Sequence, residues 1–192
     1  MKRNLFFYLF ISIALLSGCN NCEKLHLVQN EKQWVTHFTP GQQFYYKNIL
    51  SGKIDTLEVL DTSNKYTLCN KFELSEYQYE TYVVRSVFKS KNKYDGRNCL
   101  ITLTKNKKTA VDPEIIVAGL GTINNSFKRP PFKLKDTFIE GKRYTALVFF
   151  QKDINAEIYG QQQYLKSFYW DKLSGLVAYT TSDNEIYMRV AN

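Results

Sequence analysis

Histidine, methionine and tryptophan are scarce in this 192-residue chain, with two residues of each. The histidines are His26 and His37, so a catalytic triad or a Cys–His pair would have to be built on one of them. The sequence also lacks the G-x-S-x-G, H-E-x-x-H, P-loop and EF-hand patterns. We therefore expect no enzyme, no cofactor and no metal site, and we expect His37 to be a structural residue.

Cysteine and proline are also few, with four of each, which excludes a disulfide-dense scaffold. Long apolar runs are absent: the longest, LFFYLFISIALL, has twelve residues. A helix needs about 20 apolar residues to cross a bilayer, so this run is too short to be a spanning segment. No amphipathic helical pattern extends past three turns, so we expect little helix.

The apolar run follows a basic start, Met1-Lys2-Arg3-Asn4, and ends at Leu16-Ser17-Gly18-Cys19. A charged start, a short apolar region and small residues before a cut are typical of an export signal. The quartet resembles the lipobox of bacterial lipoproteins, in which leucine and two small residues precede an obligatory cysteine. The resemblance covers residues 1–19. An ordinary secreted protein with a cysteine near the cut is the other interpretation.

Membership of the lipoprotein family would imply that Cys19 receives a diacylglycerol and becomes the acylated first residue of the mature protein. Three acyl chains anchor far more firmly than a single one. Residues 1–18 are then a signal peptide and residues 19–32 a polar, lipidated tether. Asn20 is not acidic, which in some bacteria favours the outer membrane. We expect a protein of the bacterial envelope whose partner is membrane lipid through Cys19.

The remaining cysteines meet an oxidising compartment after export. Cys69 and Cys99 lie in strand-like segments separated by one hairpin-like stretch. A Cys69–Cys99 disulfide is one prediction, and two buried thiols are the alternative. Cys22 would then be left over on the tether. Its C-x-x-C spacing with Cys19 matches a redox or zinc motif, but either idea fails if Cys19 is lipidated.

Fourteen tyrosines and thirteen phenylalanines favour β structure. Apolar and polar residues alternate in short runs with turn residues between them, as in the hairpin around Ser51-Gly52-Lys53. We predict one domain, residues 33–192, built as a mostly antiparallel, strongly curved sheet or open β-barrel. The strands are expected at 42–50, 54–60, 66–72, 77–88, 99–104, 114–119, 143–151, 162–171, 175–183 and 185–192.

Two details of this prediction concern single strands. In 77–88 the apolar parity shifts near Thr81, which predicts a bulge or burial on both faces. In the last strand Ile186, Met188 and Val190 alternate with polar neighbours and Tyr187, which predicts that these three face the core. Residues 105–136 are irregular and are expected to form loops, the first place to look for a binding loop.

The net charge of +8 comes with lysine and arginine clusters at 89–93, 105–108 and 128–135. Such loops either stay solvated or form a patch for anionic lipid, polysaccharide or an envelope protein; nucleic acid is not an expected partner of an exported lipoprotein. The aromatic runs FYYK, YQYETY and SFYW are read as core residues, with sugar stacking or a lipid cavity as alternatives. The function expected is a non-catalytic binding or structural module; the alternative is a carrier or acceptor of lipid or another hydrophobic ligand.

Overall fold

The computed structural model describes residues 22–69, 77–89, 98–105, 107, 111, 113–118, 120–121, 134–139, 141–151 and 165–190. These residues form one mostly antiparallel sheet that curls strongly into a half-barrel, with a single turn of helix. The predicted fold class is therefore confirmed. Residues 1–18 and Cys19 lie outside the described residues, and so does most of the stretch expected to be irregular.

The first part of the chain supplies seven strands and the helix. Their bounds are β1 Glu23–Leu25, α2 Gln29–Lys32, β2 Gln43–Asn48, β3 Ile54–Tyr66, β4 Tyr77–Phe88, β5 Asn98–Thr104, β6 Glu114–Val117 and β7 Leu120–Gly121. The second part supplies β8 Leu134–Ile139, β9 Lys142–Gln151, β10 Leu165–Asp171, β11 Gly175–Thr181 and β12 Ile186–Arg189.

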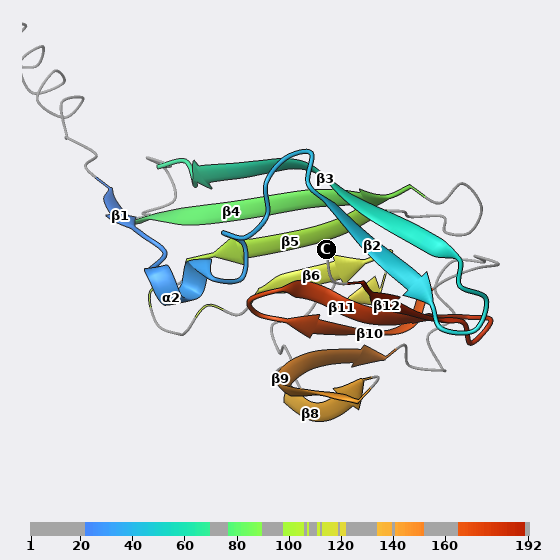
Figure 1. The fold of residues 1–192 in the computed structure, drawn as a ribbon. Helices are drawn as coiled ribbons and strands as arrows, with labels where there is room; N and C mark the ends of the chain where they lie inside the picture. Colours follow the sequence, from blue (N-terminus) through green and yellow to red (C-terminus); the bar gives the residue numbers. More distant parts are fainter. Residues whose placement is uncertain are drawn as a thin grey trace, which may run out of the picture.

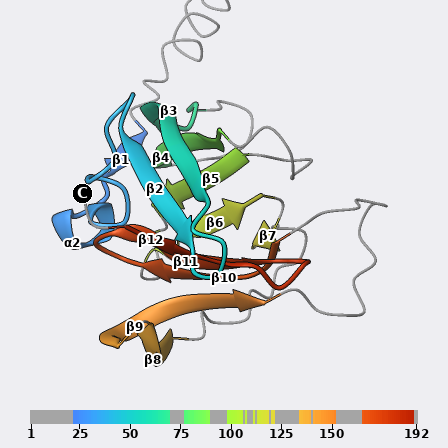
Figure 2. The same ribbon diagram turned by 45° about the vertical axis from the view of Figure 1, so that its right-hand side comes forward.

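The strand order is β7-β6-β5-β4-β3-β2-β12-β11-β10-β9-β8, with β1 added in parallel beside the start of β4. Each half is a meander of neighbouring strands, and β2 joins the halves by pairing with β12. Figure 2 shows the consequence: β2 to β6 form one wall of the curl and β10 to β12 the other, with β8 and β9 beyond them. The apolar side chains between the two walls make the core.

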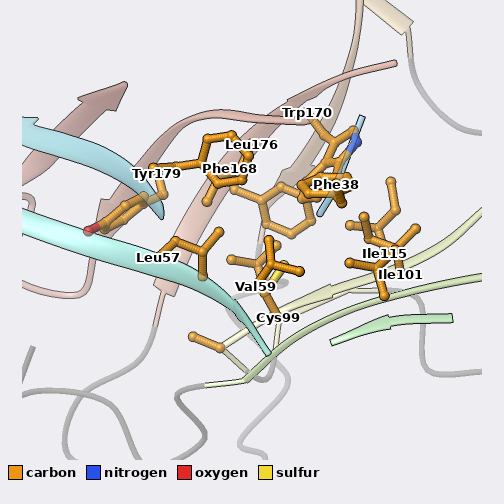
Figure 3. Close-up of a cluster of buried hydrophobic side chains, with 14 of the residues drawn as sticks. Phe38, Leu57, Val59, Cys99, Ile101, Ile115, Phe168, Trp170, Leu176 and Tyr179 are labelled. Atoms are coloured by element: carbon orange, nitrogen blue, oxygen red, sulfur yellow. The ribbon is translucent and has the colours of Figure 1, made fainter. Parts of the chain in front are cut away.

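The core contains many aromatic rings, some of them from the runs FYYK and SFYW that were predicted to lie there, whereas the tyrosines of YQYETY are only half-buried. Trp170, Tyr46, Tyr179, Phe88 and Phe168 are its largest fully buried side chains. Figure 3 shows the rings of β10 and β11 meeting the aliphatic side chains of β3, β5 and β6. These large side chains occupy the interior of the half-barrel.

The segment before the predicted domain is packed against it. Cys22 is bonded to Cys69, β1 pairs with β4, and Leu27 is buried. The sequence assigned residues 19–32 to a tether, but from Cys22 onward the described part of this segment belongs to the folded structure.

Two local expectations about β3 and β4 need correction. The strand expected at 66–72 does not form within the described residues; β3 instead runs for 13 residues and ends at Tyr66. Thr81 pairs regularly with Lys65 and Thr104, so the bulge expected near it is not there; the bulge between these strands is on β3, where Leu60 is the extra residue between the pairs Val59↔Ser86 and Asp61↔Arg85. The parity of β4 had appeared to shift because a carboxylate, Glu80, occupies an inward-facing position.

The orientation predicted for the last strand is wrong. Tyr187 is buried and stacks on Tyr179, with ring centroids 4.9 Å apart and planes 7° apart. Ile186 is instead 37% exposed and Val190 is 39% exposed. Tyr187 takes the inner face in place of Ile186 and Val190 because its ring buries more surface by stacking on Tyr179. Its hydroxyl still reaches the carboxylate of Glu185 at 3.3 Å.

Candidate binding groove

The predicted Cys69–Cys99 disulfide is wrong: Cys69 is bonded to Cys22, and Cys99 is a free, buried thiol. The strand order explains the error, because β4 lies between β3 and β5. Thr67 bonds to Tyr79, at the start of β4, whereas Cys99 pairs with Ser86 near its end. Seven residues of strand separate these positions, about 23 Å. Burial also raises the pKa of the Cys99 thiol to about 12, so it is not a nucleophile at neutral pH.

His37 lies half-buried against the ring of Phe38, at 4.0 Å between centroids. Its Nδ1 is 3.3 Å from the carbonyl oxygen of Gln33, and no described hydroxyl, thiol or carboxylate is hydrogen-bonded to the ring. Burial lowers the pKa of His37, which favours its neutral form. The described residues also contain no group of three His, Cys, Asp or Glu side chains that could hold a metal ion.

The predicted basic loops are described only in part, and their described members are already engaged. Lys89 forms an ion pair with Glu58 at 2.7 Å, and Lys105 forms one with Glu31 at 2.7 Å. Lys107 donates to the hydroxyl of Tyr77 at 2.6 Å. In these three positions the lysines fasten neighbouring segments of the fold. Residues 90–93 and 128–133 lie outside the described part.

A hollow of about 440 Å³ lies on the outer face of the second half of the sheet, opposite the core. We call it the outer groove. Its lining comes from five consecutive strands: Thr137, Phe138 and Ile139 of β8, Phe149 of β9, Lys166, Ser167 and Tyr169 of β10, Ala178 and Thr180 of β11, and Ile186 of β12. Its volume lies within the roughly 300–1,000 Å³ of small-molecule sites.

The alternation of β10 builds the floor of the groove. Phe168 and Trp170 point into the core and are fully buried, so Ser167 and Tyr169, on either side of Phe168, point outward. Tyr169 pairs with Phe149 on one side and Ala178 on the other. The rings of Phe149 and Tyr169 lie 4.8 Å apart at their centroids, while the small side chain of Ala178 leaves space. The result is an aromatic floor beside a shallow depression.

The rim combines apolar side chains with a few polar groups. Phe138 is 71% exposed and Ile186 is 37% exposed. Thr137, Ser167 and Thr180 add hydroxyls, and none of the described lining residues carries a carboxylate. The ammonium group of Lys166 is held by the side-chain oxygen of Asn184 at 2.8 Å. The groove therefore suits a ligand with an aromatic or aliphatic body and one anionic or acceptor group.

Sequence reasoning missed most of this site. Half of β8 falls within the stretch expected to be irregular, no strand was expected over its other half, and Ile186 was assigned to the core. The signal that could have found the floor is the run Ser167-Phe168-Tyr169-Trp170, whose alternation sends Tyr169 outward whenever Phe168 and Trp170 face inward.

Comparison with protein-family models, curated proteins and solved structures finds no match to this chain. Within the described residues, no helix has the length and apolar character needed to pass through a membrane.

Proposed function

We propose that this chain is a lipid-anchored, non-catalytic binding protein of the bacterial cell envelope, with the outer groove as its binding site. The single observation that supports a binding role is the groove itself, which exposes aromatic and aliphatic side chains on the outer face of a sheet whose core is already well packed. Exposed apolar patches of this kind, rimmed by polar groups, often mark interaction sites. The lipid anchor is supported by the lipobox-like residues Leu16-Ser17-Gly18-Cys19.

The groove favours a small amphipathic ligand over a fully enclosed lipid. Phe138 and Ile186 remain exposed at the rim, so a bound molecule would keep part of its surface in water. A carrier of acyl chains would instead gain from a continuous enclosed cavity. In the described half-barrel, that interior space is occupied by Trp170, Tyr179 and Phe168.

Anilinonaphthalene sulfonate tests the site, because it joins an aromatic body to an anion. We expect the purified protein to enhance the fluorescence of this probe, and Tyr169→Ser to weaken binding about tenfold, as a loss of 1.4 kcal/mol would. Tyr45→Ser is the matched control, since Tyr45 is 40% exposed on β2 and does not line the groove. Equal binding by both variants would rule out the groove. Mass spectrometry of the purified protein that found a bound lipid would favour the carrier.

The anchor is tested separately. Cys19→Ala is expected to move the protein from the membrane fraction to the soluble fraction, and mass spectrometry is expected to find acyl groups on Cys19 of the parent protein. Unchanged fractionation of the variant would contradict the lipid attachment.

A further inference from the structure

Only two residues, Asn20 and Asn21, separate Cys19 from Cys22. Cys22 is fastened to Cys69 by the disulfide, with the two Cα atoms 6.1 Å apart, and β1 begins at the next residue. A fully extended chain covers at most about 3.6 Å per residue, so the Cα atoms of Cys19 and Cys22 are within about 11 Å. A lipid on Cys19 would therefore hold the Cys22–Cys69 end of the domain close to the bilayer surface.

The side chains at this end are those expected at a membrane interface. Leu68, next to the disulfide, is 90% exposed. On one face of the sheet the Nζ atom of Lys24 lies 5.3 Å from the ring centroid of Tyr66. Near the start of β4 the Nζ atom of Lys107 lies 3.9 Å from the ring centroid of Tyr77. Tyrosine rings prefer the headgroup region, and lysine side chains can extend along them towards phosphate groups.

Among the described residues at this end, the exposed charges are mixed but mainly positive. Lys24, Lys65 and Lys107 are exposed, and Glu23 is the acid exposed beside them in this part of the chain. A basic group near an anionic bilayer surface contributes about 1 kcal/mol. The charges thus favour anionic headgroups, while the exposed leucine supplies the apolar contact.

A second apolar tip lies too far away to compete for the same bilayer. Leu50 is 86% exposed at the turn between β2 and β3. Figure 1 shows this turn at one end of the molecule and β1, with the end of β3, at the other. The 13 residues of β3 run between them, about 40 Å of strand.

We propose that the Cys22–Cys69 end is a membrane-docking surface, with Leu68 among the lipid headgroups and the Tyr66–Lys24 and Tyr77–Lys107 pairs flanking it. This orientation rests on the lipid attachment at Cys19 proposed above. The disulfide fixes which end faces the bilayer, and it directs the tip at Leu50 away from the anchored surface.

Tryptophan scanning with lipid quenchers tests the orientation. The acylated full-length protein, purified from membranes, is placed in vesicles of phosphatidylethanolamine and phosphatidylglycerol, some of whose acyl chains carry bromine near the headgroup. Leu68→Trp is compared with Leu50→Trp, and the emission of Trp34 and Trp170 is subtracted using the parent protein. Both positions are exposed, so neither substitution disturbs the core.

We expect a blue shift and a loss of emission on quenching for the tryptophan at position 68, and neither change at position 50. Equal emission from both variants in vesicle-bound, acylated protein would overturn the orientation while leaving the anchor intact. A parent protein that carries no acyl group and does not sediment with the vesicles would overturn the anchor, and the orientation with it.

Discussion

Glu80 is the charged residue on which the N-terminal segment depends. Its side chain is only 1% exposed, and its carboxylate accepts hydrogen bonds from the Leu27 backbone N–H at 2.6 Å and from Asn64 at 2.8 Å. Lys32 completes the site as an ion pair at 2.8 Å. Burial raises the pKa of the Glu80 carboxyl, but the bonds from Lys32, Leu27 and Asn64 outweigh it, and the pKa falls below its ordinary value.

We expect Glu80→Gln to lower the free energy of unfolding by about 2 kcal/mol at pH 7, because bonds to a buried charge are lost. A lowered folded-state pKa means that this stabilisation is complete above the ordinary pKa of 4.5 and is lost as the pH falls below it. The difference in the free energy of unfolding between the parent and the variant should therefore become smaller in acid. Urea unfolding at several pH values between about pH 3 and pH 7 would measure it.

Glu58→Gln is the matched control for this change. Hydrogen bonds from Lys89 and Gln43 also lower the pKa of Glu58, but its side chain is 21% exposed, against 1% for Glu80, and its partner Lys89 is 51% exposed. We expect only a small effect on stability, because exposed ion pairs contribute little. A loss as large as that of Glu80→Gln would show that burial is not what makes Glu80 important.

Comparing substitutions at Gly41 and Gly175 separates the cost of backbone strain from the cost of a steric clash with a neighbouring side chain. Both have φ near +82°, where an L-residue is strained. A Cβ at Gly41 would meet nothing within 4 Å, whereas a Cβ at Gly175 would lie 2.8 Å from Cζ of Phe38. The turn between β10 and β11 thus approaches Phe38 more closely than any side chain allows.

We expect Gly41→Ala to cost about 1–2 kcal/mol from backbone strain alone. Gly175→Ala should cost a further 1–3 kcal/mol or so, because Phe38 must move within a packed core. Thermal unfolding of both variants would measure the difference. Equal losses would contradict the close approach of Gly175 to Phe38.

At the scale of elements, the disulfide holds β1 and the end of β3 together across the start of β4. It joins residues 47 apart in sequence. A loop of that size corresponds to about 4 kcal/mol in the chain-entropy account. β1 alone has three residues, too few to keep its place in a sheet by pairing alone.

Replacing Cys22 and Cys69 together by serine should therefore lower the free energy of unfolding by about 4 kcal/mol. Hydrogen exchange should show that backbone amides lose protection first in β1 and at the start of β4. Dithiothreitol should destabilise the parent to the same level and leave the double variant unchanged. A reductant effect on the double variant would mean that another disulfide contributes.

The elements that could be predicted from the sequence are those with a regular alternation and a clear turn. The β2–β3 hairpin at Gly52 and the bounds of β4 at Tyr77 and Phe88 agree with the prediction. The error in the last strand has a simple cause: an alternating pattern identifies two faces but does not say which is inside. Tyr187 takes the inner face in place of Ile186 because a ring on β11 is there to stack on it. That contact comes from the tertiary fold.

The sequence also could not predict which strands lie next to one another when they are far apart along the chain. The sequence placed Cys69 and Cys99 in strand-like segments but could not show that β4 separates them. The outer groove depends on five strands meeting on one face, so only the outward position of Tyr169 was within reach of sequence reasoning.

At the scale of the whole molecule, the two halves of the sheet are joined through a short backbone seam and a shared core. β2 and β12 pair over only three positions. Two tyrosine hydroxyls reinforce the join: Tyr46 donates to the carbonyl oxygen of Leu176 at 3.1 Å, and Tyr179 donates to the carboxylate of Asp55 at 2.7 Å. The ring of Tyr179 also lies 5.3 Å from that of Phe88. The halves therefore lack separate cores.

A shared core predicts one cooperative unfolding unit. Tyr179→Phe keeps the ring but leaves the buried carboxylate of Asp55 without this donor, which should cost about 2 kcal/mol. Native-state hydrogen exchange can follow peptides from β4 and β5 in one half and from β10 and β11 in the other. Because β4 and β5 in one half and β10 and β11 in the other contribute to the same core, the variant should lose the same protection free energy in both halves. A loss confined to β10 and β11 would mean that the half-barrel consists of two separately unfolding sheets.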